Sequence, residues 1–257
     1  RFNQMTRYWL AESNYRLDKY KEAREEFEKL YNESALFKLP ESYLISYNIA
    51  YCYFKEEDYK QAQVWFDKYL NENSVIYRKE ALERAADSYF IVKDYRNAAK
   101  YYDMLLDDYL NVNDIWPYWR SAISHGLAGD NSGKIRLLTN VLKAEPSARF
   151  YPDALYELGR THVIMDQSAK AVECFKMLAD SSKVKDNNWV ARAYIELGSI
   201  LRNQSKFDDA LTYYKHVVEK IPLSDRVEDA LAAIESIYMT RNNPFGYLEY
   251  LARRSLP

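Results

Sequence analysis

The chain has 257 residues, and its 48% hydrophobic and 29% charged content is typical of a protein that folds around a packed core. Its 36 basic and 38 acidic residues are interspersed, and the formal net charge is −2. This balance excludes the basic surface expected of a protein that binds nucleic acid or an anionic membrane. No apolar run approaches the roughly 20 residues that a membrane-spanning helix needs.

A pattern centred on a small residue recurs along the chain. Around Ala62, aromatic residues stand three positions before and four positions after, at Tyr59 and Phe66. Tyr53 and Ala50 stand nine and twelve positions before it. The anchors of the pattern, of which Lys134 and Tyr247 are the weak ones, are in chain order Ala23, Ala62, Ala98, Lys134, Ala171, Ala210 and Tyr247. Their spacing of 36–39 residues predicts a solenoid of about seven stacked repeats.

Each repeat is predicted to be two helices joined by a short polar turn. In the second repeat the helices are residues 43–54 and 59–70, because apolar residues recur there at intervals of three and four. One helix pair cannot bury its apolar face alone, so neighbouring repeats must stack. The sequence therefore predicts an all-α chain, residues 1–257, that forms a single solenoid. The approximate repeats span residues 4–39, 43–78, 79–114, 115–151, 152–190, 191–227 and 228–257.

These residues resemble the tetratricopeptide repeat (TPR), in which a large residue is followed by Leu-Gly, Tyr, Ala, Phe and Pro. In the sixth repeat these places hold Tyr194, Leu197, Gly198, Leu201, Ala210, Tyr214 and Pro222. The resemblance covers essentially the whole chain and is weakest at Tyr247. It implies a right-handed superhelix whose first helices line a concave groove for peptide or protein ligands, and it leaves the ligand open.

The repeats exceed the common 34 residues by two to five, and the extra residues fall at the end of the second helix and in the loop that follows. The chain is similar to bacterial envelope TPR proteins of the tol-pal-associated coordinator and outer-membrane assembly lipoprotein types. The similarity lies in these longer loops and in sequence segments such as residues 150–159. That similarity implies a periplasmic or outer-membrane-associated protein, with a cytoplasmic location as the alternative. Because the sequence opens at Arg1 without Met, we expect it to be a piece of a longer protein.

No pattern of catalytic, metal-binding or phosphate-binding residues occurs in the sequence, such as His-Glu-x-x-His, paired Cys-x-x-Cys or a glycine-rich loop after a strand. His125 and His162 stand nine positions before an anchor, which predicts hydrogen-bonded core histidines. Cys52 and Cys174 fall on helices too far apart for a disulfide and are predicted to be core residues. We therefore expect no enzymatic activity, no cofactor and no metal.

The groove implied by the resemblance would be lined by first-helix residues 18, 15, 11 and 8 positions before each anchor. Its aromatic members are predicted to contact a partner, because aromatic side chains are favoured at interfaces. They are Tyr8, Tyr15, Tyr47, Tyr51, Phe54, Phe90, Trp116, Trp119 and Tyr156. The alternative is that adjacent repeats, or helices outside this chain, bury these rings.

One TPR subclass holds a C-terminal carboxylate with Lys, Asn and Arg at fixed groove positions. Asn48 and Arg84 match that arrangement. Tyr8, Glu12 and Glu80 stand where the carboxylate-binding proteins have Lys, Asn and Lys. Two acidic side chains there would repel a carboxylate, so the sequence predicts a different ligand.

The fourth repeat is irregular, because Lys134 replaces the anchor alanine and Gly126, Gly129 and Gly133 surround the turn. A bulky anchor should push the two helices apart, and glycine weakens a helix by about 1 kcal/mol. We expect a loosened turn and a local change of superhelix curvature near residues 126–134.

The sequence as a whole favours a non-enzymatic scaffold that binds a partner peptide or helix in its groove, within a bacterial cell-envelope assembly. A cytoplasmic regulatory module with an output domain outside this chain is the alternative. A glycan-binding or enzymatic groove with stacked aromatic residues is a third hypothesis. Nothing in the sequence indicates the oligomeric state.

Overall fold

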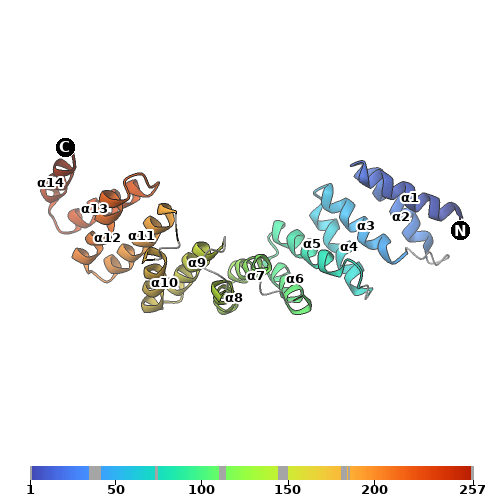
Figure 1. Cartoon of the computed structure of the whole chain (residues 1–257), viewed down its shortest axis with the longest axis horizontal. Coiled ribbons are helices and arrows are strands. Elements are labelled where there is room, and N and C mark those ends of the chain that lie inside the picture. The colour runs from blue at the N-terminus through green and yellow to red at the C-terminus, as the bar shows by residue number, and fades with distance from the viewer. Residues whose placement is uncertain are drawn as a thin grey trace. The chain divides into compact units, whose positions relative to one another are not determined.

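The computed structural model describes residues 2–34, 42–72, 75–109, 114–143, 150–180, 184 and 186–255. Within these ranges the regular secondary structure consists of fourteen α-helices and contains no strand (Figure 1). The prediction of an all-helical chain is confirmed.

The helices follow one another in pairs along the chain. The pairs are α1 (Phe2–Arg16) and α2 (Tyr20–Ser34), α3 (Ser42–Lys55) and α4 (Tyr59–Asn71), α5 (Arg78–Ile91) and α6 (Tyr95–Asp108), α7 (Trp116–Leu127) and α8 (Asn131–Lys143), α9 (Tyr151–Ile164) and α10 (Ser168–Asp180), α11 (Asn187–Asn203) and α12 (Phe207–Lys220), and α13 (Val227–Thr240) and α14 (Pro244–Ser255). This order confirms the prediction of about seven helix-turn-helix repeats.

The turn inside each repeat has one backbone conformation throughout the chain. Five positions before every anchor stands a residue with a positive φ, namely Asp18, Glu57, Lys93, Gly129, Asp166, Ser205 or Asn242. The backbone N–H of the following residue donates a hydrogen bond to the carbonyl oxygen nine positions before the anchor. In the second repeat, for example, Asp58 N donates to Tyr53 O at 3.0 Å. This is the Schellman closure that ends a helix with a left-handed residue. Its presence before the weak anchors Lys134 and Tyr247 shows that they mark the same turn as the alanines.

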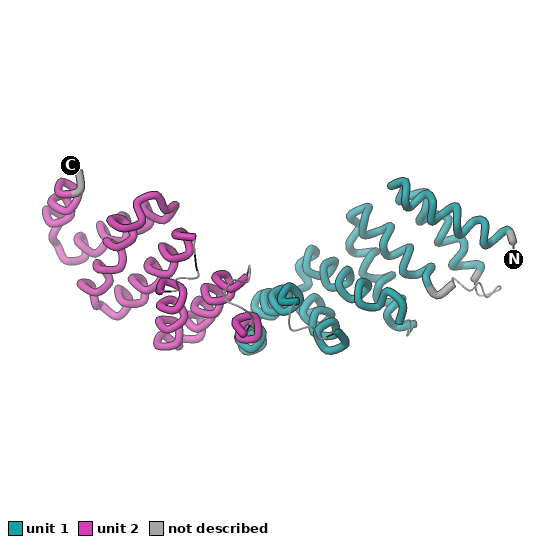
Figure 2. The backbone as a smooth tube through the Cα atoms, in the orientation of Figure 1, with its two compact units in different colours: residues 1–137 teal, residues 138–257 magenta. Residues whose placement is uncertain are grey.

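The chain divides into two compact units, residues 1–137 and 138–257, with the boundary inside α8 (Figure 2). We describe each unit by itself. That the whole chain forms one solenoid domain stays a prediction.

In both units the core is built on the anchor positions. Ala23, Ala62 and Ala98 in unit 1 are fully buried, as are Ala171 and Ala210 in unit 2. The aromatic residues four positions after them are also buried, and they are Phe27, Phe66, Tyr102, Phe175 and Tyr214. Burial of one such side chain stabilises the fold by about 1.5–3 kcal/mol. The small anchors allow the helices to approach, and the rings fill the space beside them.

The fourth repeat does not have the loosened turn expected from its glycines. Asp130 N bonds to His125 O at 2.8 Å, and the Asp130 side chain accepts from Gly133 N at 2.9 Å. Lys134 is 9% exposed, and a Cβ placed on Gly126 would lie 2.5 Å from Lys134 Cδ. Gly126 therefore provides the space into which the bulky anchor packs. The change of curvature near residues 126–134 stays a prediction.

His162 and the two cysteines lie in the core as the sequence predicts, whereas His125 is hydrogen-bonded but only half-buried. His162 is buried, with Nδ1 2.9 Å from Gln167 Oε1. His125 lies between Asp103 and Asp130, at 2.9 Å and 2.8 Å. The thiols of Cys52 and Cys174 are buried and unpaired. Burial raises their pKa to about 12 and about 11.

Candidate functional site

The first helices of the first three repeats border a groove of about 550 Å³ in unit 1. We call it the tyrosine groove. It is lined by Tyr8, Trp9, Glu12, Tyr15 and Arg16 of α1, by Leu44, Tyr47, Asn48, Tyr51 and Lys55 of α3, and by Tyr77 and Glu80 at the start of α5. Its volume falls in the range of roughly 300–1,000 Å³ that is typical of ligand sites.

Helical spacing explains why tyrosine dominates this surface. Tyr8 and Tyr15 are two turns apart on α1, and Tyr47 and Tyr51 are one turn apart on α3, so each pair shares a helix face. The rings of Tyr15 and Tyr51 meet edge to face, with centroids 6.2 Å apart. The two helices therefore bring their tyrosine faces together in the groove.

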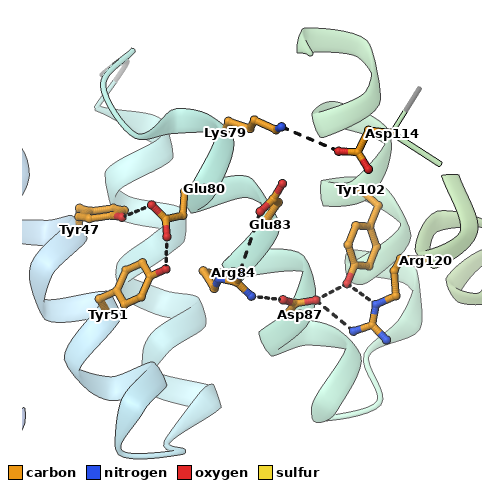
Figure 3. A network of polar contacts seen from close by, with 10 residues as sticks. All are labelled: Tyr47, Tyr51, Lys79, Glu80, Glu83, Arg84, Asp87, Tyr102, Asp114 and Arg120. Atoms are coloured by element: carbon orange, nitrogen blue, oxygen red, sulfur yellow. Dashed lines mark hydrogen bonds and ion pairs between the residues drawn. The ribbon is translucent and has the colours of Figure 1, made fainter. Parts of the chain in front are cut away.

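Glu80 joins the two tyrosines of α3 (Figure 3). The Tyr47 hydroxyl donates to Glu80 Oε2 at 2.9 Å, and the Tyr51 hydroxyl donates to Oε1. Burial, aided by the neighbouring carboxylate, raises the pKa of Tyr51 to about 12 and also raises the pKa of Tyr47. Both hydroxyls therefore stay protonated at neutral pH and act as fixed donors to Glu80.

Tyr77 covers Tyr47 from the loop before α5. The two rings are stacked, with centroids 5.2 Å apart and an interplanar angle of 17°. The Tyr77 backbone has φ 53°, a conformation that costs about 1–3 kcal/mol for a residue other than glycine. Tyr47 is 9% exposed and Tyr77 is 53% exposed. Tyr47 therefore forms the floor of the groove and Tyr77 part of its rim.

The α1 wall has the same division between a buried and an exposed ring. Tyr8 is 4% exposed, and its hydroxyl accepts from Asn48 Nδ2 at 3.1 Å. Trp9 is 51% exposed and contacts Tyr8 edge to face at 5.4 Å. Trp9 and Tyr77 are thus the two aromatic side chains that the tyrosine groove presents to solvent most openly.

A second cluster on α5 continues from Glu80 towards α7 (Figure 3). Asp87 accepts from Arg84 Nη1 at 2.6 Å, from Arg120 Nη2 at 3.0 Å and from the Tyr102 hydroxyl. The Arg120 guanidinium lies 4.3 Å from the ring centroid of Phe90. Asp87 is therefore paired with two cations.

The structure brings together four of the nine predicted partner-contacting aromatics. Tyr8, Tyr15, Tyr47 and Tyr51 all line the tyrosine groove. Phe54 is not among its lining residues; it packs edge to face on Phe66 at 6.5 Å.

The remaining predicted aromatics lie away from the tyrosine groove. Phe90 and Trp116 contact Arg120, with Trp116 at 5.3 Å and 47% exposed. Trp119 is half-buried on α7. Tyr156 belongs to unit 2.

In unit 2, Tyr156 lies in a separate groove of about 390 Å³ with a different charge. The groove is lined by Tyr156, Arg160, Arg192, Ile195, Glu196, Arg226 and Asp229. The Tyr156 hydroxyl donates to Glu196 Oε1 at 2.9 Å, and Arg192 lies 4.8 Å from the ring centroid of Trp189. With three arginines against two acids, this surface favours anions rather than cations.

Sequence reasoning missed the roles of three groove residues. Glu80 was placed on the groove wall by its distance from Ala98, but the hydrogen bonds to Tyr47 and Tyr51 depend on side-chain positions that the repeat pattern does not contain. Tyr77 lies in the connection between α4 and α5, at the end of the second repeat, where the repeat pattern assigns no role. Trp9 follows Tyr8 directly, and only its partly exposed ring in the structure singles it out.

Two further properties hold for the residues that the structure describes. Across those ranges no three His, Cys, Asp or Glu side chains are grouped so that they could hold a metal ion. Likewise, none of the helices seen there has the length and apolar character needed to cross a bilayer.

Comparison with known proteins agrees with the repeat pattern. Residues 6–34, 45–74 and 191–219 match models described as the tetratricopeptide repeat. No curated protein sequence matches the chain.

Several solved structures are similar in fold. A crystal structure of MamA protein is 19% identical with a TM-score of 0.56, over 71% of this chain and 93% of that one. MamA from Desulfovibrio magneticus RS-1 is 15% identical with a TM-score of 0.51, over 71% and 97%. YrrB, described as a TPR protein with an unusual peptide-binding site, is 17% identical with a TM-score of 0.55, over 71% and 87%. The matched segments are thus similar to the tetratricopeptide repeat, and the solved structures share this helical-repeat fold.

Proposed function

We propose that the tyrosine groove binds a segment of a partner protein, as an extended peptide or a helix, and that the chain is a non-catalytic interaction scaffold. The observation that carries this proposal is the pair of exposed rings, Trp9 and Tyr77, at the edge of a groove floored by buried tyrosines. Large aromatic side chains that can lose water on binding are typical anchors of protein interfaces.

The chemistry of the groove supports binding rather than catalysis. The hydroxyls of Tyr47 and Tyr51 donate to Glu80, and the raised pKa of both phenols keeps them protonated, so neither is an effective base or nucleophile. The position of Glu80 also argues against a C-terminal carboxylate as the ligand, because the two charges would repel. The peptide-binding site named for YrrB, a protein of similar fold, is consistent with a peptide ligand.

A library of random 12-residue peptides displayed on phage tests this proposal. Peptides enriched on the wild-type protein would be synthesised and their dissociation constants measured on the double variant Trp9→Ser, Tyr77→Ser. We expect binding to weaken at least tenfold, because two exposed anchors are removed at little cost to the core. Phe245→Ser, which removes a 76% exposed ring in unit 2, is the matched control and should leave binding unchanged. Equal binding by wild type and the double variant would contradict the proposal.

We further propose that the chain works within a bacterial cell-envelope assembly, in the periplasm or at the outer membrane. The support is the loop style of the 36–39-residue repeats and of residues 150–159. A secretory signal or a lipid-attachment cysteine in the full-length protein would support this location. An attached DNA-binding or kinase domain would instead support the cytoplasmic regulatory alternative.

A further inference from the structure

The tyrosine groove contains one carboxylate that lacks a cation. Glu80 accepts hydrogen bonds from Tyr47 and Tyr51, and no Lys, Arg or His within the described residues lies at ion-pair distance from it. A carboxylate has about four acceptor positions, so the two tyrosine donors leave one on each oxygen unused. The group is half-buried, where an unpaired charge is less well solvated than at the surface.

The cations around Glu80 are engaged elsewhere or lie away from it. Arg84, one turn further along α5, pairs with Asp87 at 2.6 Å and also interacts with the Tyr51 hydroxyl, but it is not within ion-pair distance of Glu80. Lys79 faces Asp114 at 4.0 Å (Figure 3). On the groove wall, Arg16 pairs with Glu12 at 3.0 Å, and the exposed Lys55 is not within ion-pair distance of Glu80.

Two other carboxylates of this protein combine a tyrosine donor with an arginine. Tyr53 donates its hydroxyl to Glu28 at 2.7 Å, and Arg24 both pairs with Glu28 at 3.3 Å and lies 4.5 Å from the Tyr53 ring centroid. In this triad a tyrosine orients the carboxylate, and an arginine neutralises it while covering the ring.

A second triad has the same composition. Tyr102 donates to Asp87, Arg120 pairs with Asp87 at 3.0 Å, and the guanidinium lies 5.7 Å from the Tyr102 ring centroid. Glu80 has the tyrosine donors of these triads but no arginine within ion-pair distance, and it lines a groove.

We propose that Glu80 recognises an arginine or lysine side chain of the partner segment, which pairs with the carboxylate and contacts the rings of the tyrosine groove. The inference rests on the proposed function and names the chemistry of the partner. Arginine fits best, because its fork can reach the free position on each Glu80 oxygen while its planar group lies against an aromatic ring. In the groove of unit 2, Glu196 also accepts a tyrosine hydroxyl, from Tyr156, but three arginines line that groove with it.

The test uses the same 12-residue phage library on the full chain, with two neutralising variants. Glu80→Gln removes the charge in the groove. Asp67→Asn is the matched control, because Asp67 also accepts two tyrosine hydroxyls, from Tyr89 and Tyr101 at 2.7 Å, but does not line the groove. We expect wild type and Asp67→Asn to enrich a basic residue at one fixed place in the peptides, and Glu80→Gln to lose that enrichment.

A double-mutant cycle then locates the contact. In an enriched peptide, replacing the basic residue by citrulline or norleucine should weaken binding to wild type at least about tenfold, as for a charge-assisted hydrogen bond. The same replacement should have little effect on Glu80→Gln. Equal losses on both proteins, or basic enrichment that survives Glu80→Gln, would overturn the inference. Peptides that need Trp9 and Tyr77 but show no basic preference would overturn it while leaving the proposed function standing.

Discussion

Gly126 and Lys134 reverse the order of large and small side chains found at the same two positions of the preceding repeats, where an aromatic residue faces an alanine. In the first three repeats the residue eight positions before the anchor alanine is aromatic, namely Tyr15, Phe54 or Phe90. In the fourth repeat that residue is Gly126 and the anchor is Lys134. A Cβ on Gly126 would lie 2.5 Å from Lys134 Cδ, so the two substitutions compensate for each other.

This exchange predicts strongly non-additive mutations. Gly126→Phe alone should destabilise by about 1–3 kcal/mol, because the new ring meets the Lys134 side chain. Lys134→Ala alone should leave unfilled space beside Gly126. The double variant restores the pairing of the first three repeats, and it should be more stable than the sum of the single changes allows. Urea unfolding of the four proteins measures this, and simple additivity would contradict it.

A second close approach concerns Gly198 on α11 and Tyr214 on α12. A Cβ on Gly198 would lie 2.7 Å from two carbons of the Tyr214 ring, which is fully buried and cannot move aside easily. Gly198→Ala should therefore destabilise by about 1–3 kcal/mol, although alanine favours the helix by about 1 kcal/mol.

Two variants show whether contact with the Tyr214 ring is what makes Gly198→Ala destabilising. Tyr214→Leu should make Gly198→Ala less harmful, because the ring carbons are gone. Gly246→Ala is a weaker control, since its own close contacts are to the half-exposed Tyr238 and to the Asn243 side chain. If Gly198→Ala raises the urea midpoint in the wild-type background, the packing argument is wrong.

Repeat periodicity is sufficient to predict the helix pairs, the seven turns and six buried anchors, because each is set by local sequence and by contact with the next helix; the seventh anchor, Tyr247, is half-buried. The second repeat was expected at residues 43–54 and 59–70, and the helices are Ser42–Lys55 and Tyr59–Asn71. The looser turn expected near Gly126 is wrong, because the bulky Lys134 and the small Gly126 pack against each other instead of separating the helices.

The candidate site was predictable only in outline. Position relative to the anchors places Tyr8, Tyr15, Tyr47 and Tyr51 on one surface, where the structure has the groove. The stacking of Tyr77 on Tyr47 could not be foreseen, because it depends on the left-handed backbone of Tyr77 in the connection between α4 and α5.

High pH should weaken the fold through its hydrogen-bonded tyrosines. Burial raises the pKa of Tyr51 and Tyr53 from 10.0 to about 12, assisted by hydrogen bonds to Glu80 and Glu28. The folded state therefore favours the neutral hydroxyl. The contribution of these hydroxyls to the free energy of unfolding is complete below pH 10 and is lost as the pH rises towards 12. The urea midpoint should fall between pH 9.5 and about 11.5.

The variant Tyr51→Phe, Tyr53→Phe separates these residues from other alkaline effects. It should be less stable than wild type at pH 8, because two hydrogen bonds worth about 1 kcal/mol each are lost. Its midpoint should then decline less steeply above pH 10, since two titrating groups are absent. Parallel declines in both proteins would show that other groups cause the loss.

The buried thiols should react slowly and in a defined order. Cys52 has no exposed surface and a pKa of about 12, and Cys174 is 7% exposed with a pKa of about 11; burial is the main cause in both. The thiolate is the reactive form, and each pKa unit lowers its fraction about tenfold. With Ellman's reagent at pH 8, Cys174 in the Cys52→Ala variant should therefore react faster than Cys52 in the Cys174→Ala variant. In 8 M urea both thiols should react quickly and at similar rates, because the difference belongs to the folded chain. Faster reaction of Cys52 in the native protein would mean that the helices around it, α1 to α4, open more readily than their packing indicates.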